Sequence, residues 1–161
     1  MKLIIVLSVL LFTSQSCDAQ NSSEMSNEKN SFAIVKSEQE WQNQLSSEEY
    51  YILRQKGTER PYSGEYNMHF EEGVYKCRGC NTPLFKSDSK FDSHCGWPSF
   101  DTEIESGAII KKLDKSHGMV RTEILCAKCG GHLGHVFNDG PTESGLRYCV
   151  NSLSILFDKK E

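Results

Sequence analysis

Cys126-Ala127-Lys128-Cys129 and Cys77-Arg78-Gly79-Cys80 are two C-x-x-C motifs, separated by residues 81–125. Glycines accompany both motifs, Gly79 inside the first and Gly130-Gly131 after the second, and glycine permits the tight turns that such motifs need. Four thiolates supplied in two pairs can surround one metal ion tetrahedrally, the usual arrangement of a structural zinc site. We therefore predict one Zn²⁺ per chain with no open position for chemistry, and its ligands are Cys77, Cys80, Cys126 and Cys129.

Two other uses of these four cysteines stay open. Each pair could be a redox-active dithiol, or the four could form two disulfides in an oxidising compartment. A thioredoxin-like dithiol precedes a helix in a βαβ pattern, and neither motif has that context. The pattern therefore favours zinc.

The rest of the chain predicts a mainly β domain preceded by two short helices. Capping boxes start at Ser37 and Ser46, so two helices are expected between residues 37 and 56. Strand patterns follow, and the last expected strand carries alternating apolar residues; the predicted strands cover 73–76, 108–113, 119–125, 132–137 and 146–157. The expected fold is an antiparallel β domain stabilised by a metal.

Arg147-Tyr148-Cys149-Val150-Asn151 is the segment that most strongly suggests chemistry. In a strand, Arg147, Cys149 and Asn151 share one face, while Tyr148 and Val150 can enter the core. A neighbouring arginine favours the thiolate form of cysteine, which is the nucleophile. An unpaired cysteine is more often an inert core residue, so a catalytic interpretation of this segment depends on the other motifs of the chain.

Cys95 lies in Ser93-His94-Cys95-Gly96-Trp97-Pro98-Ser99-Phe100, where glycine and proline predict a loop. It has no C-x-x-C partner, and neither has Cys149. A structural disulfide between these two cysteines is one interpretation. The other is an activated thiol on a strand and a second thiol on a mobile loop, the layout of an attacking and a resolving cysteine.

His132-Leu133-Gly134-His135 closely follows the second C-x-x-C motif. The two histidines could bind a second metal, or they could be structural. Near Cys149 a histidine could also donate to an oxyanion or transfer a proton, because its unperturbed pKa of about 6.5 is close to working pH.

Residues 1–16 have the layout of a secretory signal, with Lys2 at its start and an apolar run over residues 3–12 that is too short for a permanent membrane anchor. Cleavage before Cys17 followed by lipidation, and cleavage after Ala19, are both open. Residues 17–36 are polar and are expected to form a disordered tether to a domain at 37–158. We expect an exported bacterial protein, periplasmic or membrane-anchored as a lipoprotein.

The composition narrows the possible partners. The chain has 161 residues and a formal net charge of −4, which suits one slightly acidic domain after the first segment is removed. No basic stripe is visible, so nucleic-acid binding is disfavoured. Nothing in the sequence demands more than a monomer.

Five segments in this order closely resemble the B-type methionine sulfoxide reductases, which act on the R epimer of methionine sulfoxide. The segments are Cys77-x-x-Cys80, Cys95-Gly-Trp-Pro-Ser-Phe100, Cys126-x-x-Cys129, His132-Leu-Gly-His-Val-Phe137 and Arg147-Tyr-Cys-Val-Asn-Ser152. The resemblance covers about residues 37–157. It implies two antiparallel sheets with a structural zinc, and a role in protein repair under oxidative stress.

The resemblance also implies residue roles. Cys149 would be the nucleophile that becomes a sulfenic acid, and Cys95 would resolve it to a disulfide that a thioredoxin-like protein reduces. Arg147 matches the position near the thiolate, and the other matched positions line or support the substrate pocket: His132, His135, Asn151, Trp97 for the substrate methyl group, Phe137 and Asp139. Such a pocket suits methionine sulfoxide, which is polar at S=O and apolar at the methyl group.

Two other functions stay open at this point. A zinc module that binds a protein partner would need the C-x-x-C motifs but neither Cys95 nor Cys149 as an accessible thiol. A redox sensor would form the Cys95–Cys149 disulfide without acting on a sulfoxide.

Overall fold

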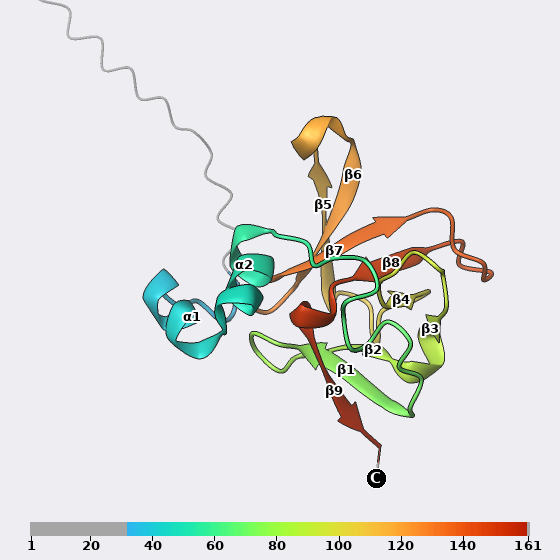
Figure 1. The fold of residues 1–161 in the computed structure, drawn as a ribbon, viewed down its shortest axis with the longest axis horizontal. Helices are drawn as coiled ribbons and strands as arrows, with labels where there is room; N and C mark the ends of the chain where they lie inside the picture. Colours follow the sequence, from blue (N-terminus) through green and yellow to red (C-terminus); the bar gives the residue numbers. More distant parts are fainter. Residues whose placement is uncertain (1–31, 161) are drawn as a thin grey trace, which may run out of the picture. The chain divides into compact units, whose positions relative to one another are not determined.

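The computed structural model describes residues 32–160, which fold around two antiparallel sheets (Figure 1). The predicted signal segment, Cys17 and the first part of the predicted tether lie outside the described residues. Within residues 32–160 no helix has the length and apolar character needed to cross a membrane.

The larger sheet has six strands in the order β3-β4-β8-β7-β6-β5, and the smaller has three in the order β2-β1-β9. All strand pairs are antiparallel. The large sheet is built from β3 (Lys90–Phe91), β4 (Ser99–Phe100), β5 (Ile109–Asp114), β6 (Arg121–Cys126), β7 (His132–Phe137) and β8 (Arg147–Val150). The small sheet is built from β1 (Gly73–Cys77), β2 (Pro83–Lys86) and β9 (Ile155–Lys159). The predicted mainly β fold is confirmed.

Two helices precede the sheets, as predicted. α1 (Glu38–Gln44) and α2 (Ser47–Gln55) both begin with a complete capping box, at Ser37 and Ser46. In each box a serine and a glutamate satisfy backbone N–H groups that the first turn leaves unpaired. Trp41 of α1 and Leu53 of α2 are buried and belong to the domain core.

Aromatic rings join the two sheets. Phe85 of β2 stacks on Phe100 of β4 with ring centroids 4.2 Å apart, and Tyr75 of β1 meets the same ring edge-on at 5.0 Å. Tyr148 of β8 contacts Phe85 from the large sheet. Tyr148 and Val150 are therefore on the core side of β8, which leaves the opposite face of this strand for Arg147 and Cys149.

Two expectations from the sequence were wrong. The single strand expected over residues 146–157 is two strands in different sheets, β8 and β9, separated by a 3₁₀-helix at Ser152–Ser154. The chain turns there because the carboxylate of Glu59 accepts hydrogen bonds from the backbone N–H groups of Ser152 and Leu153, at 2.6 and 3.1 Å.

The segment 93–100 is also not a loop throughout. Its last two residues form β4, which pairs with β8 and places Ser99 opposite Cys149. The loop that carries Cys95 is therefore tied at one end to the strand that carries Cys149.

Candidate active site

The four cysteines of the C-x-x-C motifs form one compact cluster. Their sulfur atoms all lie within 4.8 Å of one another, with 3.7 Å between Cys77 and Cys129 and 3.6 Å between Cys80 and Cys126. Four sulfurs at about 2.3 Å from a central zinc would be about 3.8 Å apart along each tetrahedral edge. The cluster therefore has the donor chemistry and the dimensions of a metal site.

Matching turns present the two cysteine pairs. The backbone N–H of Asn81 bonds the carbonyl of Cys77, and that of Gly130 bonds the carbonyl of Cys126, both at 2.8 Å. Asn81 and Gly130 both have positive φ, 59° and 71°, a conformation that favours glycine or asparagine. The next element after each motif is a strand, β2 or β7, and not a helix, so neither motif has the context of a thioredoxin-like dithiol.

A row of side chains crosses the large sheet at Cys149. The strand register pairs Ser99 with Cys149, Cys149 with His135, and His135 with Glu123. Directly opposed residues of antiparallel strands place their side chains on the same face. The backbone pairing of β4, β8, β7 and β6 therefore assembles a hydroxyl, a thiol, an imidazole and a carboxylate on one surface.

Cys95 contacts this row at Cys149. The two sulfur atoms are 3.7 Å apart and both cysteines are free thiols, so a small movement would bring them to disulfide distance. The contact with Cys149, together with the hydroxyls of Ser93 and Ser99, lowers the pKa of Cys95 to about 4. The same contact and burial raise the pKa of Cys149, while Arg147 lowers it. Of the two thiols, Cys95 is therefore the more readily deprotonated in this arrangement, while Arg147 acts in favour of the Cys149 thiolate.

A β-bulge brings the two histidines together. In a regular strand, residues three apart point to opposite faces. The β6–β7 register shifts so that Ile124 opposes Gly134 while Leu125 opposes His132, which leaves Leu133 as an extra residue. The rings of His132 and His135 consequently lie 5.6 Å apart.

Each histidine is bonded to a carboxylate that in turn contacts a cation. His135 Nε2 lies 2.8 Å from Asp114 Oδ2, which also accepts from Arg121 at 2.7 Å. His132 Nδ1 lies 2.8 Å from Glu123 Oε1, and Lys56 donates to the other oxygen of Glu123 at 2.7 Å. Burial lowers the pKa of His135 despite the bond to Asp114, so this ring is neutral near pH 7.

A hollow of about 110 Å³ opens beside Cys149. Two of its lining residues, Thr58 and Arg121, were not suggested by the sequence. Five others were predicted: Cys149, Trp97, His135, Phe137 and Asn151. The lining combines the aromatic rings of Trp97 and Phe137 with polar side chains, which suits a group that is polar at S=O and apolar at its methyl group.

The segment at Thr58–Glu59 holds two of these walls in place. Trp97 donates from its indole N–H to the carbonyl of Glu59 at 3.2 Å, and the backbone N–H of Glu59 donates to Asn151 Oδ1 at 3.1 Å. The amide of Asn151 also donates to the carbonyl of Leu133. Asn151 therefore links three chain segments around the hollow.

Arg147 and Asp139 form a bidentate ion pair, with both nitrogen–oxygen distances at 2.8 Å. The guanidinium also lies 4.4 Å from the ring of Phe137, a cation–π contact. This arrangement holds Arg147 and Phe137 together at the site. Of the predicted pocket residues, His132 and Asp139 do not line the small hollow as it is formed by residues 32–160.

Several site residues were missed from the sequence because they act through long-range contacts. They are Thr58, Glu59, Ser93, Ser99, Asp114, Arg121 and Glu123. Only the strand alternation of Arg121 and Glu123, both polar on one face of β6, gave a usable signal.

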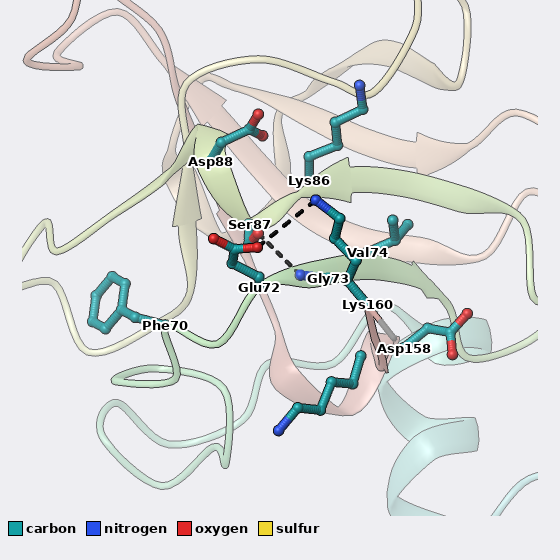
Figure 2. Close-up of a pocket in the computed structure, with 10 residues that line it drawn as sticks. Phe70, Glu72, Gly73, Val74, Lys86, Ser87, Asp88, Asp158 and Lys160 are labelled. Carbon is teal, nitrogen blue, oxygen red and sulfur yellow. Dashed lines mark hydrogen bonds and ion pairs between the residues drawn. The ribbon is translucent and has the colours of Figure 1, made fainter.

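A larger hollow of about 650 Å³ lies elsewhere, beside β1, β2 and β9 (Figure 2). Its lining is of mixed charge, with lysines at 86, 159 and 160 and acidic residues at 72, 88 and 158. Lys160 forms an ion pair with Glu72 there (Figure 2). It shares no residue with the hollow at Cys149. The convergence of thiols, histidines and aromatic residues therefore marks the smaller hollow as the candidate active site.

Comparison with known proteins agrees with this geometry. The SelR domain family matches residues 45–159. A protein of Teredinibacter turnerae called peptide methionine sulfoxide reductase MsrB is 57% identical over 127 residues, 79% of this chain and 94% of the relative. Proteins of the same name from Agrobacterium fabrum and Leptospira interrogans are 55% and 52% identical, over 78% and 80% of this chain and 93% and 98% of the relatives.

Proposed function

The chain belongs to the SelR family of B-type peptide methionine sulfoxide reductases, and we propose that Cys149 is the nucleophile of its reaction. The protein is an oxidoreductase that returns the R epimer of methionine sulfoxide in proteins to methionine. The observation that carries the assignment of Cys149 is its position in the wall of the small hollow, 3.7 Å from the sulfur of Cys95.

In the first step, the sulfur of Cys149 attacks the sulfoxide sulfur, and the neighbouring Cys95 thiolate can accept the proton that Cys149 holds. The oxygen takes up a proton and passes to the sulfur of Cys149 as the S=O bond breaks; the bond between the two sulfurs also breaks, so that Cys149 becomes a sulfenic acid and methionine is released. Trp97 and Phe137 form the apolar wall for the methyl group. Polar groups on the histidine side of the hollow face the oxygen.

In the second step, Cys95 attacks the sulfenic acid and water leaves, so that a Cys95–Cys149 disulfide forms. An external dithiol then reduces this disulfide and restores both thiols. The proposal is supported by the contact between the two sulfurs and by the position of Cys95 on a loop, next to the hydroxyls of Ser93 and Ser99. We propose a thioredoxin-like protein as the donor.

Four cysteines are positioned to bind one metal ion, and we propose that the ion is Zn²⁺. All four positions of a tetrahedral ion would be filled by thiolates, so its contribution would be to stability. The ion would connect β1 and the turn after it with the end of β6, and so fix the sheets relative to one another.

We propose that the protein is exported and works as a monomer. Residues 1–16 support export, and Cys17 supports a lipid anchor if cleavage occurs before it. A donor in that compartment would be an extracytoplasmic thioredoxin-like protein. Labelled-lipid incorporation compared between the natural chain and Cys17→Ser tests the anchor.

The proposed catalytic role is tested with a peptide carrying the separated R and S epimers of methionine sulfoxide and dithiothreitol as reductant. We expect the wild-type protein to consume the R epimer only and Cys149→Ser to consume neither. Full activity of a folded Cys149→Ser variant would overturn the assignment of the nucleophile.

A further inference from the structure

Glu123 is a buried carboxylate held between two other charged or titratable groups. Its side chain is 4% exposed, and its two oxygens contact different partners: Oε1 lies 2.8 Å from His132 Nδ1, and Oε2 accepts from Lys56 Nζ at 2.7 Å. An ionised carboxylate only accepts hydrogen bonds. His132 therefore carries its proton on Nδ1 towards Glu123, and its Nε2 is the nitrogen left for other partners.

That second nitrogen is buried and unpaired. His132 Nε2 has no hydrogen-bond partner within residues 32–160, which is uncommon because buried polar atoms are nearly always bonded. His132 lines a second hollow of about 500 Å³, which shares Thr58, Arg121 and His135 with the small hollow at Cys149. The imidazole of His132 therefore lies next to the substrate site, 5.6 Å from the ring of His135, which lines it.

Lys56 occupies an unfavourable backbone position. It ends α2 in the left-handed conformation, at φ 58° and ψ 36°, where helices usually have glycine. Lysine is less favourable than glycine in this backbone conformation. Unlike glycine, it has a side chain that reaches the buried carboxylate of Glu123. Residues whose type is unfavourable for their backbone conformation are often found at functional sites.

We propose that Glu123 and Lys56 are positioning residues, which hold His132 so that Nε2 can deliver the proton taken up by the sulfoxide oxygen, directly or through one water. The inference rests on the proposed function. For this step a second proton binds at His132 Nε2. Cys149 thiolate, the sulfoxide and this proton then give Cys149 sulfenic acid, methionine and His132 with a proton on Nδ1 alone. The sulfoxide oxygen moves to the sulfur of Cys149 with the proton from His132, and the electron pair of the broken bond remains on the methionine sulfur.

The test compares the single-turnover rate of wild type with Glu123→Gln, Lys56→Gly and Lys56→Arg, using a methionine-R-sulfoxide peptide and following Cys149 sulfenic acid. Glutamine replaces one of the two carboxylate oxygens by an NH₂ donor, so it cannot accept from both His132 and Lys56, which contact different oxygens. We expect the maximal rate to fall about 10-fold or more in Glu123→Gln and Lys56→Gly, part of the 10²–10⁴-fold typical of general acid catalysis. The half-saturating peptide concentration should change less than about two-fold, because neither residue lines the hollow at Cys149 and substrate binding is left intact.

Lys56→Arg keeps the charge and should recover most of the rate. Lys56→Gly relieves the backbone strain and removes a side chain that is largely exposed, so this variant should fold. It therefore provides the test if Glu123→Gln fails to fold. Glu71→Gln is the matched control, because it removes an ion pair with Lys159 that is exposed and distant in sequence.

Nitrogen-15 NMR of the histidine rings supplies a readout that a purely structural role would not move. Wild type should show His132 with its proton on Nδ1, and Glu123→Gln should show a mixture of tautomers. Folded variants with wild-type rates and an unchanged tautomer would overturn the inference. Failure of wild type to reduce the R epimer would instead overturn the proposed function.

Discussion

In the β7–β8 ladder, His135 lies directly opposite Cys149. Opposed residues of an antiparallel pair have Cβ atoms about 4.5–5.5 Å apart on one face. The imidazole is therefore placed beside the thiol by backbone hydrogen bonds of the sheet, whereas Cys95 reaches the same thiol from a loop. The sheet thus fixes the nucleophile and its polar neighbour, and the loop presents the resolving cysteine to them.

Removal of each thiol should affect a different step. Cys149→Ser should abolish turnover, because the attacking sulfur is gone. Cys95→Ser should still convert about one equivalent of sulfoxide per protein and then lose recycling by a thioredoxin-like donor, because the sulfenic acid has no resolving partner. Quenched-flow measurement of methionine formed per protein checks both. Sustained thioredoxin-dependent turnover by Cys95→Ser would refute the resolving role.

The contact between the thiols predicts an unusual reactivity of Cys95. Its pKa is lowered to about 4, first by the contact with Cys149 and then by the hydroxyls of Ser93 and Ser99. A thiol with a lowered pKa is already deprotonated above that value, so the rate at which iodoacetamide alkylates Cys95 should be nearly constant between about pH 5.5 and 8. Mass spectrometry of the alkylated peptide checks the profile.

Cys149→Ala is the control for this reactivity. It removes the largest contribution to the lowered pKa, so the alkylation of Cys95 should then increase with pH across the same range. A wild-type profile with the midpoint of an ordinary thiol, about pH 8.5, would show that the thiolate is not held at Cys95.

Removal of the metal should unfold the domain. Structural zinc in small domains contributes about 10–16 kcal/mol of apparent binding free energy, which is as large as the whole stability of a typical domain. We expect Cys126→Ser to lose bound metal and the cooperative thermal transition, and a chelator to do the same to wild type. Cys149→Ser should retain one metal per chain. Elemental analysis with circular dichroism melting measures both, and a metal-free chain that melts like wild type would contradict a structural role.

The parts of this fold that the sequence predicted depend on neighbours in the chain. Ser37 and Ser46 identified the two helix starts, because each forms a capping box with the glutamate three positions later. The alternation of residues along 147–150 placed Cys149 on the face away from the core. The C-x-x-C spacing identified the metal cluster for the same reason.

The parts that were missed depend on contacts between distant segments. The break between β8 and β9 follows from the carboxylate of Glu59, more than ninety positions away, capping Ser152 and Leu153. The bulge at Leu133, which brings His132 beside His135, appears only when β6 and β7 are paired. Local patterns carry neither kind of information, so the polar supports of the site emerged only from the structure.

The closest packing at the site surrounds Gly134, which lies one residue before His135. A Cβ atom added there would be 2.0 Å from the backbone carbonyl oxygen of Cys149, and backbone cannot yield as a flexible side chain can. Gly134→Ala should therefore separate β7 from β8, with a loss of about 3 kcal/mol in the free energy of unfolding and a large fall in kcat/KM. Urea denaturation and the R-sulfoxide assay measure the two effects.

Gly107→Ala separates this clash from backbone strain. Both glycines have a positive φ, 152° at Gly134 and 88° at Gly107, but no atom lies within 4 Å of a Cβ added at Gly107. Its substitution should cost only the conformational strain, about 1 kcal/mol, and leave kcat/KM unchanged. If Gly134→Ala is no more destabilising than Gly107→Ala, and keeps full activity, then the alignment of His135 with Cys149 does not require the close approach of β7 to β8. The larger loss at Gly134 is expected because the clash acts directly on the backbone of the nucleophile.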